Sequence, residues 1–200
     1  MINCLLAYLL GSIPSGVWVG QYFYQTDIRQ MGSGNMGTTN TFRVLGPKAG
    51  TIVLFMDLAK GAIPVLIATY LLPTFPFSPL FVGAFAVLGH TFPIFAQFRG
   101  GKAVATFSGV MLAYIPLVVL VCLVIFLVTL YLTRMVSLTS MVTISIGVLL
   151  TLFYQDWFLT TISLVADLFI IYRHRSNIKR ILDGTESKVT FPWEKKQDTK

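Results

Sequence analysis

Residues 103–132 read AVATFSGVMLAYIPLVVLVCLVIFLVTLYL, a stretch of about 30 residues without a charged side chain. A helix needs roughly 20 apolar residues to cross a bilayer, so this stretch is long enough to enter a membrane, and Gly109 and Pro116 interrupt it. Five further stretches are similarly apolar: Asn3–Phe23, Ala49–Leu72, Pro79–Phe95, Val136–Tyr154 and Trp157–Tyr172. The sequence therefore predicts an all-α, polytopic integral membrane protein.

The composition supports this interpretation. Hydrophobic residues make up 55% of the chain and charged residues 12%, with a mean hydropathy of +0.76, which leaves too few polar residues to cover a soluble globule. The net charge of +7 occurs without the aromatic and basic patterns of nucleic-acid readers, so no nucleic-acid partner is expected. Cys4 and Cys122 lie far apart in apolar runs, without metal-ligand spacing. We expect membrane lipid around the chain, and no metal or organic cofactor.

Basic residues predict the orientation, because Lys and Arg favour the cytoplasmic side. They follow the first span, the third span and the last span, at Arg29, Arg43, Lys48, Arg99, Lys102 and the Arg173–Arg180 cluster. Six simple crossings that start outside would leave the basic C-terminus outside. We therefore expect residues 103–132 to form two helical pieces that leave and return to the cytoplasmic side. One long tilted helix with a local exception to the charge rule is the alternative.

This interpretation gives a bundle of about seven helices, with the N-terminus outside and the C-terminus cytoplasmic. The chain shows no internal repeat and no composition change that would divide it. We expect one membrane domain over residues 1–182, followed by a loosely ordered polar cytoplasmic tail over residues 183–200.

The first polar segment, residues 27–46, reads DIRQMGSGNMGTTNTFRVLG. Glycines at 32, 34 and 37 permit positive φ angles, so that consecutive N–H groups can converge on an anion. Thr39 and Asn40 are placed to begin a helix whose N-terminus favours negative charge, and Arg43 offers a bidentate guanidinium. The pattern favours a phosphate site; a flexible turn with ordinary helix caps is the alternative.

The second polar segment is Gly100-Gly101-Lys102, with Thr106 one turn further on. Two glycines again precede a cation. The residue after Lys102 is Ala103, so the segment lacks the Walker A pattern and nucleotide hydrolysis is not expected. A basic loop that obeys the charge rule explains the lysine but leaves the paired glycines unexplained.

The third polar segment, YRHRSNIKR at residues 172–180, places His174 and Asn177 three residues apart on one helix face among basic side chains. Taken alone it is typical of a block that stops membrane transfer. Ser137 and Ser140 begin a span that should face the same compartment, where either can simply cap a helix.

Four ionisable residues fall inside predicted spans, where they are costly. Asp57 and Lys60 share a helix face, which favours a structural ion pair below the site. His90 is either a hydrogen-bonded structural residue or a substrate contact. Asp167 has no evident partner in the sequence.

Three segments, GSGNMGTTNTFR, GHTFPIFAQFRGGKAVAT and YRHRSNIKR, occur in an order and spacing that closely resemble the bacterial acyl-phosphate-dependent glycerol-3-phosphate acyltransferases. The resemblance covers nearly the whole chain. It implies acyl transfer from acyl phosphate to the 1-hydroxyl of glycerol 3-phosphate, which gives lysophosphatidate and inorganic phosphate as the first step of phospholipid synthesis. It also implies a seven-helix fold in the bacterial inner membrane and an active site facing the cytoplasm. No obligate protein partner is inferred.

Matched residue by residue, the resemblance implies two groups of site residues. The catalytic candidates are Ser33, Arg43, Lys102, His174 and Asn177. The substrate-binding candidates are Gly34, Asn35, Thr39 and Asn40, with Ser140 as a weaker match. His90 is added as a further candidate for substrate binding, although the resemblance does not supply it.

The HxxxxD pattern of other glycerol phosphate acyltransferases, in which His is the base, is absent: Phe95 and Lys179 stand at that offset from the two histidines. We therefore expect the acceptor's own phosphate to help deprotonate the attacking hydroxyl, while Arg43 and Lys102 stabilise the leaving phosphate. A transporter of organic phosphates is the competing hypothesis, because transporters also use broken helices and buried charges. The lack of an inverted repeat weighs against it.

Overall fold

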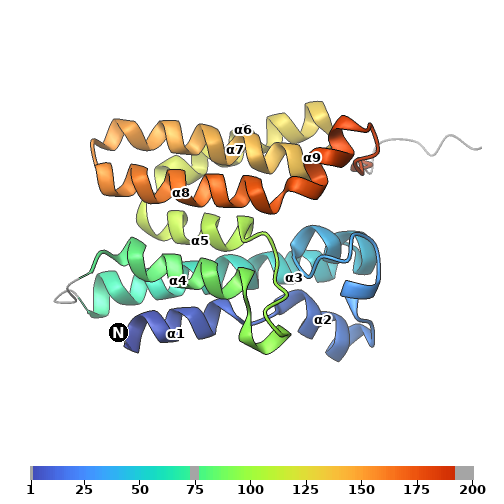
Figure 1. The fold of residues 1–200 in the computed structure, drawn as a ribbon, viewed down its shortest axis with the longest axis horizontal. Helices are drawn as coiled ribbons and strands as arrows, with labels where there is room; N and C mark the ends of the chain where they lie inside the picture. Colours follow the sequence, from blue (N-terminus) through green and yellow to red (C-terminus); the bar gives the residue numbers. More distant parts are fainter. Residues whose placement is uncertain (1, 73–76, 192–200) are drawn as a thin grey trace, which may run out of the picture.

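The computed structural model describes residues 2–72 and 77–191, and within them the chain is helical without a strand. Figure 1 shows most of the helices running along the long axis of the molecule, with α5 between two layers. One layer holds α1 (Ile2–Gly11), α3 (Thr38–Leu66) and α4 (Pro79–Thr91), and the other holds α6 (Pro116–Thr133), α7 (Val136–Thr151) and α8 (Trp157–Arg173). The N-terminus lies at one end and α9 (Arg175–Leu182) at the other.

The predicted spans are largely confirmed as helices. Four helical stretches, 38–71, 79–96, 116–133 and 136–154, are long and apolar enough to cross a membrane. The pair α1 and α2 (Ser15–Tyr24) would make a fifth span, bent by 45° at the break between them. The last predicted span is the 17-residue helix α8.

The second span differs from its prediction at its start. Its helix begins at Thr38, well before the expected Ala49, and Gly46 kinks it with φ 83°, a conformation that favours glycine. Its end turns into a π-helix, Ile67–Leu71. The loop predicted to bind phosphate is therefore joined directly to a membrane helix.

Residues 103–132 are broken into two helices, α5 (Val104–Tyr114) and α6, as predicted. The break falls at Ile115, which precedes Pro116 and has φ −135° and ψ 66°, because a residue before proline avoids the helical region. The chain reverses there (Figure 1). Both outer ends of this pair contact α9 or the segment after it: Lys102 bonds to Asn177 of α9, and the Arg134 carbonyl accepts from the amide of Val189. The membrane sides of these ends remain a prediction.

Gly109 was expected to help break this stretch, and that prediction is wrong. It lies inside α5, where an added Cβ would come within 2.0 Å of the Leu58 carbonyl oxygen of α3. Gly61 of α3 stands in the same relation to the carbonyl of Thr106 of α5, also at 2.0 Å. These two glycines let α3 and α5 pack backbone against backbone, as small residues do between membrane helices.

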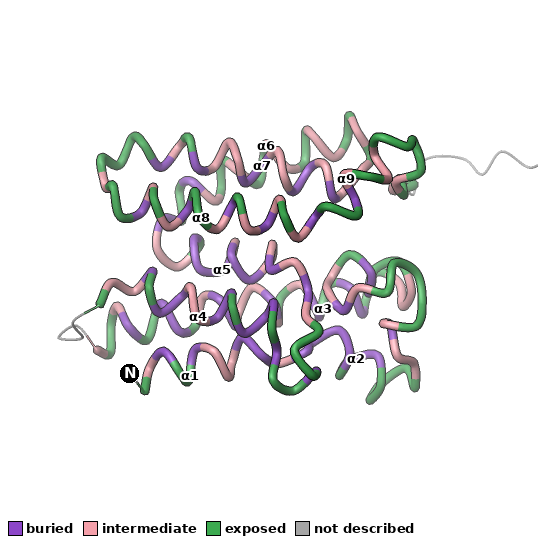
Figure 2. The backbone as a smooth tube through the Cα atoms, viewed as in Figure 1, coloured by how far each residue is buried: buried purple, intermediate pink, exposed green. Residues whose placement is uncertain are grey.

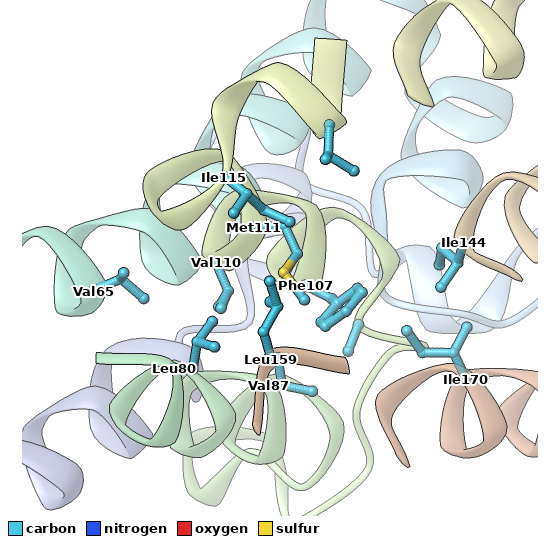
Figure 3. Close-up of a cluster of buried hydrophobic side chains, with 12 residues drawn as sticks. Val65, Leu80, Val87, Phe107, Val110, Met111, Ile115, Ile144, Leu159 and Ile170 are labelled. Atoms are coloured by element: carbon cyan, nitrogen blue, oxygen red, sulfur yellow. The ribbon is translucent and has the colours of Figure 1, made fainter. Parts of the chain in front are cut away.

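The main core cluster lies around α5 and includes Val110, Met111, Leu80 and Leu159 (Figure 3). Most residues of α5 are buried or partly buried, as Figure 2 shows. In α6, by contrast, Val118 is the one buried residue, and most of the exposed side chains are leucine and valine. An apolar helix that is this exposed fits contact with lipid.

Replacing Gly61 or Gly109 by alanine should destabilise the protein by about 1–3 kcal/mol, because overpacking forces the two backbones apart. Thermal unfolding in detergent measures this change. Gly147→Ala is the matched control, since its Cβ would meet only the Cys122 Sγ at 3.1 Å. Equal unfolding temperatures for the three variants would contradict the close-packing role.

Candidate active site

The first polar loop joins α2 to α3 and is held by Asn40. This side chain is buried; its Nδ2 donates to the carbonyls of Ile28 (2.8 Å) and Met31 (3.1 Å). Its Oδ1 accepts from the amide of Ser33 (2.9 Å) and from the Ser33 hydroxyl (3.1 Å). Asn40, predicted to touch substrate, thus fixes the loop that carries Ser33.

The predicted anion nest is only partly formed. Gly32 and Gly34 have positive φ angles, 61° and 69°, as expected, but Gly37 has φ −88°. The amides of Ser33, Gly34 and Gly37 donate to Asn40, Met31 and Asn35 respectively, so they do not converge on a free anion site. Loop closure by the asparagine side chains accounts for this difference.

A cavity of about 690 Å³ opens beside this loop. Three predicted site residues, Ser33, Gly34 and Asn35, line it. The rest of its wall comes from Asp27, Arg29, Gln30, Met36, residues 97–100 and Arg173. The guanidinium of Arg29 pairs with Asp27 at 2.7 Å, so the cavity presents both charged and polar groups to a ligand.

The second polar segment uses its glycines differently from the prediction. Gly100 and Gly101 lack positive φ angles. They pack on His90 instead: a Cβ on Gly100 would lie 2.2 Å from the His90 carbonyl oxygen, and one on Gly101 would lie 2.1 Å from Nε2 of the ring. Their carbonyls accept from the Arg173 guanidinium, each at 3.1 Å. The glycine pair therefore seats the loop that ends in Lys102.

Lys102 meets the third polar segment directly. Its Nζ donates to Oδ1 of Asn177 in α9, so two residues 75 positions apart in sequence form one cluster. The Asn177 Nδ2 donates to Glu186 at 2.7 Å. Ser137 of α7 donates to the same carboxylate oxygen at 2.6 Å, and the Arg180 Nε donates to the other oxygen at 2.7 Å.

The electrostatics of Lys102 follow from this crowding. Its pKa is lowered to about 8, chiefly by burial, while the negative charge of Glu186 acts in the opposite direction. The charges of Arg180, Arg43 and Arg173 lower it further. At pH 7 Lys102 is a cation that can bind a phosphate, and it loses its proton when the pH rises through about 8.

His174 lies between α8 and α9 and is buried. Its pKa is lowered to about 4, first by burial and then by the charge of Lys102, so the ring is neutral at pH 7. Nδ1 lies 2.8 Å from the carbonyl of Ile170. Because a carbonyl only accepts, Nδ1 carries the hydrogen and Nε2 is left as an acceptor.

The remaining predicted residues take different places. Arg43 and Thr39 are exposed in the first turns of α3, and Arg43 lies near enough to Lys102 to influence its pKa. The hydroxyl of Ser140 donates to the Val136 carbonyl of its own helix at 2.8 Å, whereas its neighbour Ser137 reaches the Lys102 cluster through Glu186.

A buried polar network lies beneath the loops. The Asp57 carboxylate pairs with Lys60 at 2.8 Å, as predicted, and accepts from Ser15 (2.9 Å) and from Thr38 (3.2 Å). Lys60 also donates to the Ile13 carbonyl at 2.9 Å. The network joins the break between α1 and α2 to the first residue of α3, so it positions the first polar loop.

His90 belongs to this network and does not line the cavity. Its Nδ1 lies 3.1 Å from the Thr106 hydroxyl and 3.8 Å from Asp57. The structure therefore gives His90 a supporting position under Gly101. Asp167, which had no evident partner in the sequence, accepts from Ser145 of α7 at 3.0 Å.

Sequence reasoning missed Glu186, which bonds to three residues of this cluster. It stands in a polar tail that has no helix periodicity or motif to single it out. In the chain from 2 to 72 and 77 to 191, no group of three His, Cys, Asp or Glu side chains is placed to hold a metal ion.

Comparison with known proteins gives a consistent result. The family model described as glycerol-3-phosphate acyltransferase matches residues 1–184. A glycerol-3-phosphate acyltransferase of Levilactobacillus brevis is 54% identical over 192 residues, covering 94% of this chain and 92% of its relative. One of Enterococcus faecalis is 52% identical over 201 residues, covering 96% and 92%.

Two solved structures of PlsY, an integral membrane glycerol 3-phosphate acyltransferase, share the fold at 38% identity and cover 94% of both chains. The glycerol 3-phosphate form has a TM-score of 0.89 and the lysophosphatidic acid form 0.84. The chain therefore belongs to the glycerol-3-phosphate acyltransferase family.

Proposed function

We propose that this protein transfers an acyl group from acyl phosphate to the 1-hydroxyl of glycerol 3-phosphate, giving lysophosphatidate and inorganic phosphate. The observation that carries the proposal is the contact between Lys102 and Asn177, with His174 close enough for the lysine charge to lower its pKa, at the end of the bundle where the Ser33 loop lines a cavity. A cationic and amide-rich site beside apolar helices suits a reaction between a soluble phosphate and a lipid chain. Relatives solved in glycerol 3-phosphate and lysophosphatidic acid forms support it.

The reaction needs charge stabilisation more than a strong acid. The acceptor oxygen attacks the acyl carbonyl carbon, the bond from that carbon to the phosphate oxygen breaks, and the hydroxyl proton leaves with a phosphate base. Phosphate leaves an acyl phosphate readily, and Lys102 and Arg43 supply the positive charge that stabilises the departing phosphate. Ser33, Asn177 and the free Nε2 of His174 hold the acceptor in line.

Further residues of the loop, Gly34, Asn35, Thr39 and Asn40, together with Ser140 and His90, are proposed to bind substrate directly or through the loops that they hold. We also propose that residues 1–182 form one catalytic domain in the bacterial inner membrane. The basic loops at the α9 end then face the cytoplasm, where glycerol 3-phosphate is available, and the N-terminus lies outside. The reaction uses no cofactor and no obligate protein partner in this proposal.

The test is inorganic phosphate release by the purified protein in lipid, given palmitoyl phosphate with and without glycerol 3-phosphate. Release that requires both substrates and yields lysophosphatidate supports the proposal. No release from folded protein, combined with uptake of glycerol 3-phosphate into vesicles, would instead indicate the transporter.

The His174→Ala variant should keep measurable activity, because the imidazole is proposed to orient the acceptor and the acceptor's phosphate to take the proton. A loss of about 10²–10⁴-fold is typical when a general acid or base is removed, and we expect less than this range. Steady-state kinetics with Asn177→Ala in parallel measures the effect. Complete inactivity of His174→Ala with glycerol 3-phosphate binding intact would identify a histidine base.

The value of kcat/KM for glycerol 3-phosphate should fall as the pH rises through about 8, the pKa of Lys102. This ratio reports the ionisation of the free enzyme, and the uncharged amine binds phosphate poorly. A profile of initial rates from pH 6 to pH 10, at constant ionic strength, measures this fall, the alkaline limb of the profile. A flat profile through pH 10 would show that the charge of Lys102 is not required.

A further inference from the structure

Glu186 lies in the tail, just beyond the residues that the family model matches, yet its side chain is only 6% exposed. The backbone fixes the segment that carries it. The amides of Thr185 and Glu186 donate to the Arg180 carbonyl at 2.8 and 3.0 Å, and the amide of Val189 donates to the Arg134 carbonyl at 2.8 Å. The first part of the predicted loose tail is thus tied to the helix ends.

The carboxylate of Glu186 determines which way the Asn177 amide faces. An ionised carboxylate only accepts hydrogen bonds, so the NH₂ group of Asn177 must point toward it. The amide oxygen then points toward Lys102, where it accepts from the ammonium group. A rotated amide would set its NH₂ group against the lysine cation and its oxygen against the carboxylate.

The charge of Glu186 also acts on Lys102. The charged and titratable groups around Lys102 are Arg43 from α3, Arg173 and His174 at the end of α8, and Arg180 from α9; Glu186 is the negative group among them. The neutral ring of His174 adds no charge at pH 7. Without Glu186 the lysine would face arginine charges alone and lose its proton more easily.

We propose, on the basis of the proposed acyl transfer, that Glu186 is a positioning residue that orients Asn177 toward Lys102 and balances the cations around the site. It acts through these two side chains and does not touch the reacting atoms. The carboxylate also joins α7 to α9 through Ser137 and Arg180, which keeps the cluster in place while substrates enter.

The experiment compares Glu186→Gln with the wild type in the phosphate-release assay. Gln keeps the size of the side chain but loses the charge and one acceptor, so kcat/KM for glycerol 3-phosphate should fall by at least about tenfold, the usual effect of a hydrogen bond to a charged group. The alkaline limb of its pH profile should move to lower pH. Glu186→Asp keeps the charge and should hold the limb close to that of the wild type.

Asp183→Asn is the matched control, since this carboxylate lies exposed in the same tail. It should change neither kcat/KM for glycerol 3-phosphate nor the pH of the alkaline limb. Thermal unfolding confirms that each variant is folded.

A loss of activity in Glu186→Gln without a shift of the limb would leave Glu186 only a structural tie and overturn the proposal. A lower KM would also overturn it, by showing that the carboxylate competes with substrate phosphate. An inactive wild type would refute the proposed acyl transfer itself, whereas an active wild type with an unshifted variant refutes only the role of Glu186.

Discussion

Replacing Lys102 by alanine should lower kcat/KM for acyl transfer by about 10²–10³-fold, the cost of removing one group that stabilises developing negative charge. Lys102 lies where the second and third polar segments meet, and it donates to Asn177 there. The guanidinium of Arg173 donates to the Gly100 and Gly101 carbonyls, so it is not free to replace Lys102, and Arg43 is proposed to act together with the lysine. Initial rates of phosphate release with both substrates measure the change.

Lys48→Ala is the matched control for this variant. Lys48 is exposed on α3 and has the same charge, so its loss changes the net charge equally without touching the cluster. The control should keep wild-type kinetics. A Lys102→Ala enzyme that stays within threefold of the wild type would contradict the role of this lysine.

Replacing Asp57 by alanine should destabilise the protein by about 3–5 kcal/mol, because it leaves Lys60 buried without its counter-charge. Asp57 and Lys60 side chains are each 3% exposed, and the carboxylate also accepts from Ser15 and Thr38. The variant therefore loses the ion pair and two hydrogen bonds, one from the first residue of α2 and one from the first residue of α3. Thermal or denaturant unfolding in detergent measures the loss.

Two further variants separate the charge from the packing. Asp183→Ala removes an exposed carboxylate and should leave the unfolding temperature unchanged. Combining Asp57→Ala with Lys60→Met removes both charges and should recover part of the stability. If the double variant were less stable than Asp57→Ala, the unpaired lysine would not be the cause of the loss.

The sequence predicted the membrane helices well, because long apolar stretches leave few alternatives in a bilayer. It also predicted the break in residues 103–132, since Pro116 disfavours a continuous helix and the charge rule required a reversal. Within that stretch Gly109 was misassigned. A glycine that breaks a helix and a glycine that lets two helices pack closely look the same in the sequence. Only the contact with a second helix distinguishes them.

The predicted site shows the same contrast. Lys102 and Asn177 were selected from separate segments, and the structure brings them into direct contact. The glycines at 100 and 101 were noted because they precede a cation, and the structure shows that they pack against His90. Glu186 was not selected at all, because its importance comes only from the way the tail folds back. Long-range contacts of this kind leave no local signal in a sequence.

The most direct test of the proposed reaction uses glycerol 3-phosphate labelled with ¹⁸O at the 1-hydroxyl, incubated with palmitoyl phosphate and the purified protein in lipid. Mass spectrometry of the products follows the label. Attack of the acceptor hydroxyl on the acyl carbonyl predicts that lysophosphatidate retains the ¹⁸O in its ester and that the released phosphate carries none. Label in the inorganic phosphate, or no lysophosphatidate formed from acyl phosphate, would contradict the proposed acyl transfer.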